Sequence, residues 1–219
     1  MLITLVAVFF GIAIANASDT SDDVTSAPRE NPVLDGIYIY KSDGTTKAVE
    51  GTDFNVDTTN RVITILKNDL VLTGGADKGP INARIVVPVE TTETVNKLTL
   101  DELHIYDKTA DHSTLEINCP TSTEADSNAS PDFTLGIKNA NTLYQTLDEE
   151  DLHGGKAIEI SGGSANGFTI EGLRPEDEIS KLECVAYYRD AIFVNTNEPV
   201  TFTGTFDALV YSLKDDGID

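Results

Sequence analysis

Short apolar runs that alternate with polar residues recur along the chain from residue 33 onward. Most of them set an apolar residue beside Thr, Glu or Lys, which is the period of a half-buried β-strand. No window after Pro32 keeps a helical period over ten residues. The pattern predicts an all-β domain with strands at 37–40, 62–66, 70–72, 84–87, 97–100, 103–106, 114–117, 133–137, 157–160, 168–170, 184–188, 191–194, 200–206 and 208–211.

Two arrangements of these strands are open. A β-sandwich of antiparallel hairpins uses Asn-Gly and Asp-Gly turns, of which the chain has Asp35-Gly36, Asp43-Gly44 and Asn166-Gly167. A parallel β-solenoid uses very short strands, with Asn and Gly at corners that need a left-handed backbone. The stretch GKAIEISGGSANGFTIEGL at 155–173 favours the solenoid, because AIEI and FTI would form two sides of one coil with SGGSANG at the corner. The spacing of apolar runs predicts a repeat of about 20 residues.

The block from Lys97 to Phe206 resembles the parallel β-helix repeats of bacterial surface proteins described as carbohydrate-binding-domain-containing. The matching pieces are LTLDELHI (98–105), TLGIKNANTL (134–143), KAIEI (156–160) and GFTIEGL (167–173). The resemblance covers about half of the chain and implies a solenoid in an extracellular setting. The family label implies sugar binding, but no set of sugar-binding residues carries over to numbered positions. The chain departs from the pattern in its few, irregular repeats and in an acidic insertion at 146–151.

Residues 1–17, MLITLVAVFFGIAIANA, are an apolar segment that is short for a membrane span. The segment ends in Ala15-Asn16-Ala17, the small-x-small pattern of a signal-peptidase site, but lacks a basic residue before the apolar run. It is either a removed signal peptide or a retained assembly arm that resembles the apolar N-terminal segments of pilin-type subunits. The retained arm would make its contacts through Leu2, Ile3, Leu5, Val6, Val8, Phe9, Phe10 and Ile12. Residues 18–32 read as a polar linker and 33–219 as the β-domain.

The chain carries 37 acidic and 15 basic residues, a formal net charge of −22. Such a charge repels phosphate backbones and anionic headgroups, so nucleic acid is excluded as a partner. Contact with a membrane is expected only through residues 1–17, if they are retained. Export places the protein outside the cell or on its surface.

Cys119 and Cys184 are the only two cysteines, and in an exported chain they are expected to form one disulfide, with two buried thiols as the alternative. The closed loop would stabilise the fold by about 3–4 kcal/mol. Asn128, in the polar stretch TSTEADSNASPD, begins an N-x-S sequence and is a candidate glycosylation site.

Metal and enzyme motifs are weak in this sequence. His104 and His112 flank YDKTADH, where Asp107 and Asp111 would complete a metal set, but the spacing matches no zinc pattern. Calcium is conceivable at Asp148–Asp151 or Asp215–Asp216, and no other cofactor is expected. Outward carboxylates at Asp101, Glu102, Glu116, Glu159 and Glu171 would suit a polysaccharide-cleaving β-helix, yet no catalytic basic residue accompanies them. We expect no enzymatic activity.

These features favour an extracellular structural subunit of a surface filament, assembled from copies of itself through the N-terminal arm. The segment VTFTGTFDALVY at 200–211 would be an end strand that a neighbouring arm completes by strand addition. The alternative is a cell-surface adhesin that binds glycans, with Tyr38, Tyr40, Tyr187 and Tyr188 as candidate stacking residues.

Overall fold

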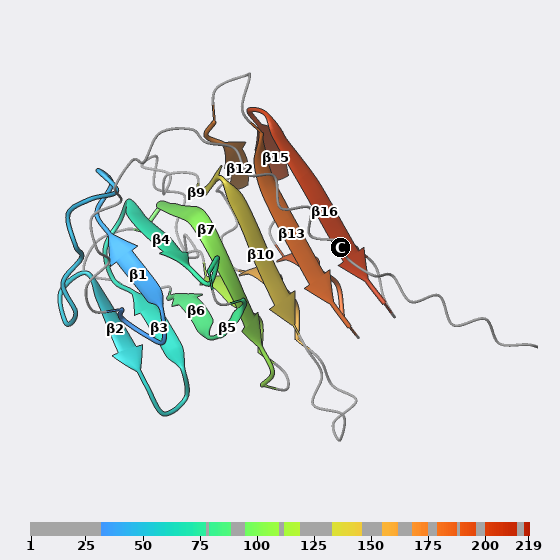
Figure 1. The fold of residues 1–219 in the computed structure, drawn as a ribbon. Coiled ribbons are helices and arrows are strands. Elements are labelled where there is room, and N and C mark those ends of the chain that lie inside the picture. Colours follow the sequence, from blue (N-terminus) through green and yellow to red (C-terminus); the bar gives the residue numbers. More distant parts are fainter. Residues whose placement is uncertain are drawn as a thin grey trace, which may run out of the picture.

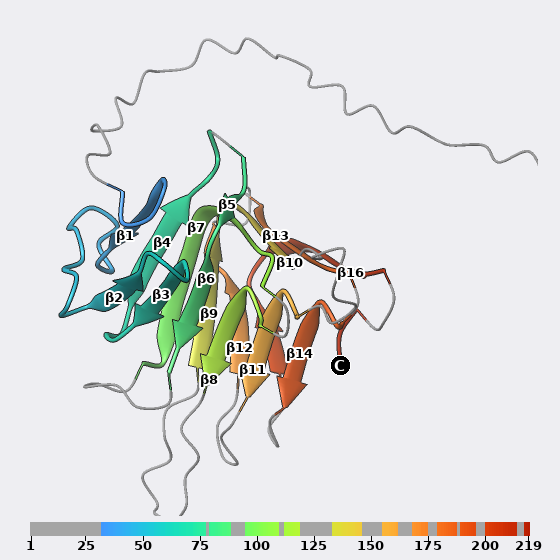
Figure 2. The ribbon, with the colours of Figure 1, turned by 90° about the horizontal axis from the view of Figure 1, so that it is seen from below.

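The computed structural model describes residues 32–77, 79–88, 95–109, 112–118, 133–145, 155–161, 168–174, 179–187, 189–195, 200–213 and 217–219. Within these residues the chain forms strands and turns and no helix, so the predicted all-β class is confirmed. The strands form two sheets, and the larger one curls around the smaller one (Figures 1 and 2).

The larger sheet has ten strands in two arms that share one long strand, β7 (Lys97–Asp107). The first arm joins the N-terminal half of β7 to β1 (Ile37–Tyr40), β4 (Leu70–Gly74), β9 (Phe133–Lys138), β12 (Phe168–Gly172) and β15 (Val200–Thr203). The second arm joins its C-terminal half to β5 (Ile81–Asn82), β10 (Ala140–Gln145), β13 (Ser180–Ala186) and β16 (Phe206–Ser212).

The smaller sheet has six strands and faces the larger one. Its order is β14 (Ile192–Asn195), β11 (Ile158–Ser161), β8 (Leu115–Asn118), β6 (Arg84–Val87), β3 (Val62–Ile65) and β2 (Phe54–Asp57). Antiparallel pairing is restricted to β1 with β4 and β2 with β3; the other pairs of described strands are parallel. Parallel pairing disfavours the alternative of a sandwich built from hairpins.

From β4 onward the chain visits the strand sets in a fixed order: first arm, second arm, smaller sheet. Thus β9, β10 and β11 are followed by β12, β13 and β14, each paired in parallel with its counterpart one repeat earlier. The arrangement is compatible with the predicted solenoid class. AIEI and FTI lie in different sheets, as expected, while the spacer at 162–167 lies outside the described residues.

The core is built from rows of aligned side chains. In the first arm Leu98, Leu135 and Ile170 are register partners, and all three are fully buried. In the smaller sheet Leu115 and Ile158 are register partners in the same way, and both are fully buried. Alternation in each strand sends one set of side chains inward, so each short strand buries apolar surface against the strands before and after it.

The repeat is longer than the sequence predicts. The pairing of Leu98 with Leu135 and of Leu135 with Ile170 sets a repeat of about 35 to 37 residues, so the prediction of about 20 is wrong. The reason is that each repeat passes through three strands before it returns to the same sheet, whereas the spacing argument compared apolar runs that belong to different sheets.

The corners between the two arms use left-handed backbone. Gly74 has φ +151° and Gly75 has φ +86°; one repeat later Glu102 has φ +55°, and in the next Asn139 has φ +59°. A Cβ at Gly75 would lie 2.4 Å from the carbonyl oxygen of His104, so only glycine fits there. The prediction of Gly and Asn at corners holds for Gly74, Gly75 and Asn139, and Glu102 carries the strain of a residue that rarely adopts this region.

The predicted runs at 97–100 and 103–106 form one strand, β7, bent at Glu102. Three strands were not predicted: β2, β5 and β10. The sequence of β2, FNVD, alternates apolar and polar residues and could have been predicted as a strand. IN has only two residues and half of ANTLYQ is polar, so pairing with neighbouring strands makes β5 and β10 extended.

Candidate functional site

The least covered end of the molecule is formed by β15, β16 and residues 217–219, which we call the open end. Among the described strands, β15 pairs only with β12 and β16 only with β13. Residues 217–219 run along β14, because the Ile192 amide donates to the Gly217 carbonyl at 3.0 Å and the Val194 amide to the Asp219 carbonyl at 2.8 Å. One whole layer therefore has strand partners on a single side.

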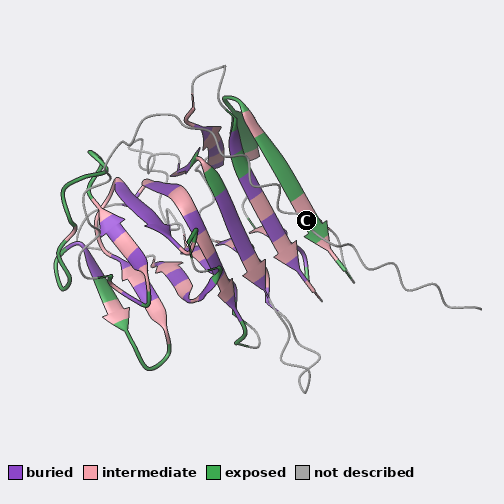
Figure 3. Ribbon diagram, in the orientation of Figure 1, coloured by how far each residue is buried: buried purple, intermediate pink, exposed green. Residues whose placement is uncertain are grey.

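Side chains that point toward the core remain exposed at the open end. Phe202 is the register partner of Ile170, yet Phe202 is 47% exposed and Ile170 is fully buried. Ile218 bridges to Ile192, and their exposures are 53% and 1%. Val210 continues the row of buried Cys184 and is only partly buried. In Figure 3 most of β16 is coloured as exposed.

The turn between β15 and β16 is fixed by Gly204, which has φ +75°. A Cβ at this position would lie 2.3 Å from the carbonyl oxygen of Gly172, so a side chain cannot fit. Phe202 and Phe206 stack across the turn with ring centroids 6.1 Å apart. The open end is thus an ordered apolar surface with two unpaired strand edges.

The opposite end is closed. There β1 and β2 run antiparallel to their partner strands, β4 and β3. Ile39 on β1 and Phe54 on β2 are buried, and so is the nearby Leu34. The carboxylate of buried Asp53 accepts the Val49 amide at 2.8 Å and lies 3.3 Å from the Lys41 ammonium. The two ends therefore differ: one has a folded cap, and the other exposes apolar residues.

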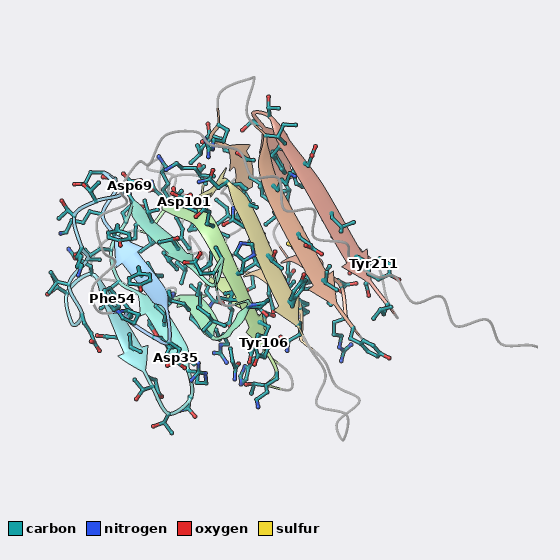
Figure 4. The ribbon with its side chains drawn as sticks, viewed as in Figure 1. Asp35, Phe54, Asp69, Asp101, Tyr106 and Tyr211 are labelled. Carbon is teal, nitrogen blue, oxygen red and sulfur yellow. The ribbon has the colours of Figure 1, made fainter. Side chains whose placement is uncertain are left out.

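A second feature lies on the outer face of the second arm. Tyr106 and Tyr144 are register partners, and Val185 and Tyr211 continue the same row, which we call the tyrosine row. Tyr106 and Tyr211 lie on the same outer face in Figure 4, and Tyr211 is 50% exposed. Sequence reasoning missed this row, because parallel pairing brings together tyrosines that lie a full repeat apart.

The neighbouring outward row holds His104, Thr142, Glu183 and Leu209. His104 Nδ1 lies 3.0 Å from Thr142 Oγ1, and partial burial lowers the pKa of His104, against the opposing effect of Glu102 and Glu183. Burial raises the pKa of Tyr144, and the nearby Glu183 raises it further. Both side chains are therefore neutral near pH 7.

The structure does not bring the proposed metal set together. His104 lies in an outward position of β7 and Asp107 is buried in an inward one, while His112 is exposed and Asp111 lies outside the described residues. No group of three or more His, Cys, Asp or Glu in the described ranges is placed to hold a metal ion. The calcium candidates Asp148–Asp151 and Asp215–Asp216 lie outside those ranges.

The predicted carboxylates lie at intermediate exposure on outer faces. Glu116 and Glu159 are register partners, Lys156 lies 3.1 Å from Glu159, and Arg84 lies 3.6 Å from Glu116. Asp101 pairs with Lys138 at 2.9 Å. Glu116, Glu159 and Asp101 each have a structural partner. Glu171, on β12, lies in the larger sheet, whereas Glu116 and Glu159 lie in the smaller one.

Cys184 is fully buried, and burial raises the pKa of its thiol far above the usual range. Its proposed partner Cys119 lies outside the described residues, so the disulfide stays a prediction. The same holds for glycosylation at Asn128 and for the assembly residues between Leu2 and Ile12. Tyr38 and Tyr40 are half-buried on β1, Tyr187 is half-buried after β13, and Tyr188 is not described.

No family model matches this chain, and no curated protein or solved structure matches it. In the part of the chain that the structure describes, no helix could span a membrane.

Proposed function

We propose that this protein is an extracellular structural subunit whose β-domain is a parallel β-solenoid and whose open end docks a segment of a neighbouring copy. The solenoid assignment is supported by the fixed order in which the chain visits the three strand sets. The resemblance to β-helix repeats of bacterial surface proteins belongs to the same proposal. No catalytic role is part of it.

The observation that carries the proposal is the exposure of core-facing residues on the last layer, above all Phe202 and Ile218. Burying the remaining half of each side chain would contribute about 1 kcal/mol apiece. A strand added along β16 would also satisfy its unpaired backbone groups. The apolar residues between Leu2 and Ile12 are the proposed occupant, because they are the longest apolar run in the chain.

The closed end supports a direction for this assembly. Among the described residues, the antiparallel strands β1 and β2 bury Ile39 and Phe54 at the closed end. That end therefore offers no parallel apolar layer onto which the open end of a second copy would stack. An arm that crosses from one copy to the open end of the next would make a heterologous contact, which repeats into an open filament unless the rotation closes a ring. The polar linker at 18–32 would give the arm its reach.

The test compares three variants with the intact chain by electron microscopy and sedimentation velocity. We expect filaments from the intact chain and from Val49→Ser, whose apolar side chain is 54% exposed near the closed end. We expect monomers from a chain lacking residues 1–32 and from Phe202→Ser. Equal assembly by all four would refute the proposal, and so would a monomeric intact chain.

The tyrosine row favours a second candidate function, glycan binding at the cell surface. Tyr106, Tyr144 and Tyr211 offer amphipathic rings along one outer face, with Thr142 and Glu183 beside them. Aromatic rings with a polar tip suit ligands that are partly apolar and partly hydroxylated. A glycan array with Tyr144→Ala and the control Val49→Ser, at an exposed position near the closed end, tests this, and an array without binding would end it.

A further inference from the structure

A polar groove of about 570 Å³ lies near the closed end, beside the Tyr106 end of the tyrosine row, because the lining residue Asn82 is the register partner of Tyr106. It forms where the β2–β3 turn, β5, β6 and the segment after β7 meet, elements that Figure 1 shows close together. Its lining includes Asn60, Arg61, Asn82, Arg84, Lys108 and His112. Its volume is in the range of small-ligand pockets, but its lining is unusually polar.

The groove is lined by more basic than acidic side chains, whereas the chain as a whole has more acidic than basic residues. The chain has only 15 basic residues against 37 acidic ones, yet three basic side chains line this groove with a single carboxylate, Asp57. That carboxylate is engaged within its own turn, where it accepts the amides of Thr59 and Asn60 at 2.9 Å each and the Asn60 side chain at 2.7 Å. Asp57 is therefore held within its own turn, and it contributes one negative charge to the groove against the three cations.

The three cations are only partly neutralised. Arg61 is well paired, with Asp35 at 2.7 Å and the Asn82 carbonyl at 2.6 Å. Arg84 has only Glu116, at 3.6 Å from Nη2, which is longer than a hydrogen bond. Within the described part of the chain, Lys108 is exposed and has no ion-pair partner. Among the described residues, Lys108 therefore carries a charge without an ion-pair partner, and Arg84, whose charge is paired with Glu116, keeps unused hydrogen-bond donors.

Arg84 is also incompletely hydrogen-bonded. Its Nε is buried and has no hydrogen-bond partner among the described residues. Buried donors are rarely left in this state, and a guanidinium presents a planar fork that matches a carboxylate in two parallel hydrogen bonds. The side chain is mostly buried, at 18% exposure, so it is held in place before a ligand arrives.

We propose that this groove binds a hydroxylated carboxylate, such as one uronic acid unit of an acidic polysaccharide. Arg84 and Lys108 bind the carboxylate. The amides of Asn60 and Asn82 and the hydroxyl of Thr109 line the same groove and are suited to sugar hydroxyls. This inference rests on the exported subunit proposed above, and the site is separate from the open end. It would bind a single acidic sugar unit, because the net charge of −22 repels an extended polyanion.

The test is titration of the full-length Phe202→Ser chain, which we expect to be monomeric, with glucuronate, glucose and sulfate, followed by backbone amide chemical shifts at low salt. We expect glucuronate to bind with a Kd of about 1 mM or tighter, with shifts at residues of the groove. Arg84→Gln should weaken binding about tenfold or more, and Lys108→Gln about threefold. Arg189→Gln, which removes an exposed arginine outside the groove, should leave binding unchanged.

The Lys108 variant keeps the test decisive if Arg84→Gln does not fold, because Lys108 is exposed. Three results would overturn the proposal: no glucuronate binding at tens of millimolar, glucose binding as tightly as glucuronate, or equal weakening by Arg189→Gln. Binding of sulfate without glucuronate would also overturn it, since it would show a general anion site that does not recognise the sugar.

Discussion

Asn141 is the side chain whose removal should reveal most about how the two arms are joined. It is 1% exposed and lies at the corner where the backbone ladder is interrupted. Its Oδ1 accepts the Leu103 amide at 2.9 Å, and its Nδ2 donates to the Lys138 carbonyl at 3.0 Å. Asn141→Ala removes both hydrogen bonds and leaves the Leu103 amide buried without a partner.

The magnitude follows from these contacts. Each lost hydrogen bond contributes about 1 kcal/mol, and an unsatisfied buried donor costs about 1–3 kcal/mol. We therefore expect Asn141→Ala to lower the free energy of unfolding by about 3 kcal/mol in urea titration, with an unchanged slope. The matched control Asn55→Ala, at an exposed position in β2, should change it by less than about 0.5 kcal/mol. A loss below about 1 kcal/mol for Asn141→Ala would refute the corner argument.

Three further predictions rest on single side chains. The pKa of His104 is lowered from 6.5 by burial, so the folded state binds fewer protons there than the unfolded state. Stability should therefore be greatest well above pH 6.5 and fall as the pH drops below it, and His104→Gln should flatten that slope in urea titrations. Burial should protect Cys184 from iodoacetamide in the folded protein; after unfolding without reductant, mass spectrometry showing alkylated Cys184 would contradict the disulfide with Cys119. Glu102→Asn should stabilise the fold by about 0.5–1 kcal/mol, because Asn tolerates φ +55° better than Glu; equal stabilisation by Glu171→Asn would argue against strain as the cause.

The strands were largely predictable because burial on one face leaves a period of two in the sequence. Ile37, Ile63 and Leu115 begin or lie in runs that alternate clearly, and all are fully buried. Strand β10 was missed because its sequence ANTLYQ is half polar, including buried Asn141. Its strand conformation comes from pairing with β7 and β13, which a local pattern cannot report.

The segment 200–211 was expected as an end strand, and its strands β15 and β16 each pair on one side only among the described strands. The expected run at 200–206 is wrong in one respect, because Gly204 ends β15 and turns the chain into β16. The exposure of Phe202 could not be predicted from the sequence. It becomes apparent only from the register, which pairs Phe202 with buried Ile170 in the preceding layer. The groove is hidden for the same reason. Arg61, Arg84 and Lys108 have no motif spacing, and only the stacking of repeats brings them together.

The cap on one end and the bare layer on the other make stability directional. Each strand of the described layers gains most of its support from the layers directly before and after it, so the molecule behaves as a line of coupled units. Thermal opening is expected to start at β15 and β16, where pairing is one-sided and apolar side chains are already half exposed, and to move inward one layer at a time. Strands β1 and β2 also pair on one side only, but Ile37 and Phe54 on them are buried, which opposes opening at that end. Amide protons should therefore exchange fastest in β15 and β16 and slowest around β7 and β9.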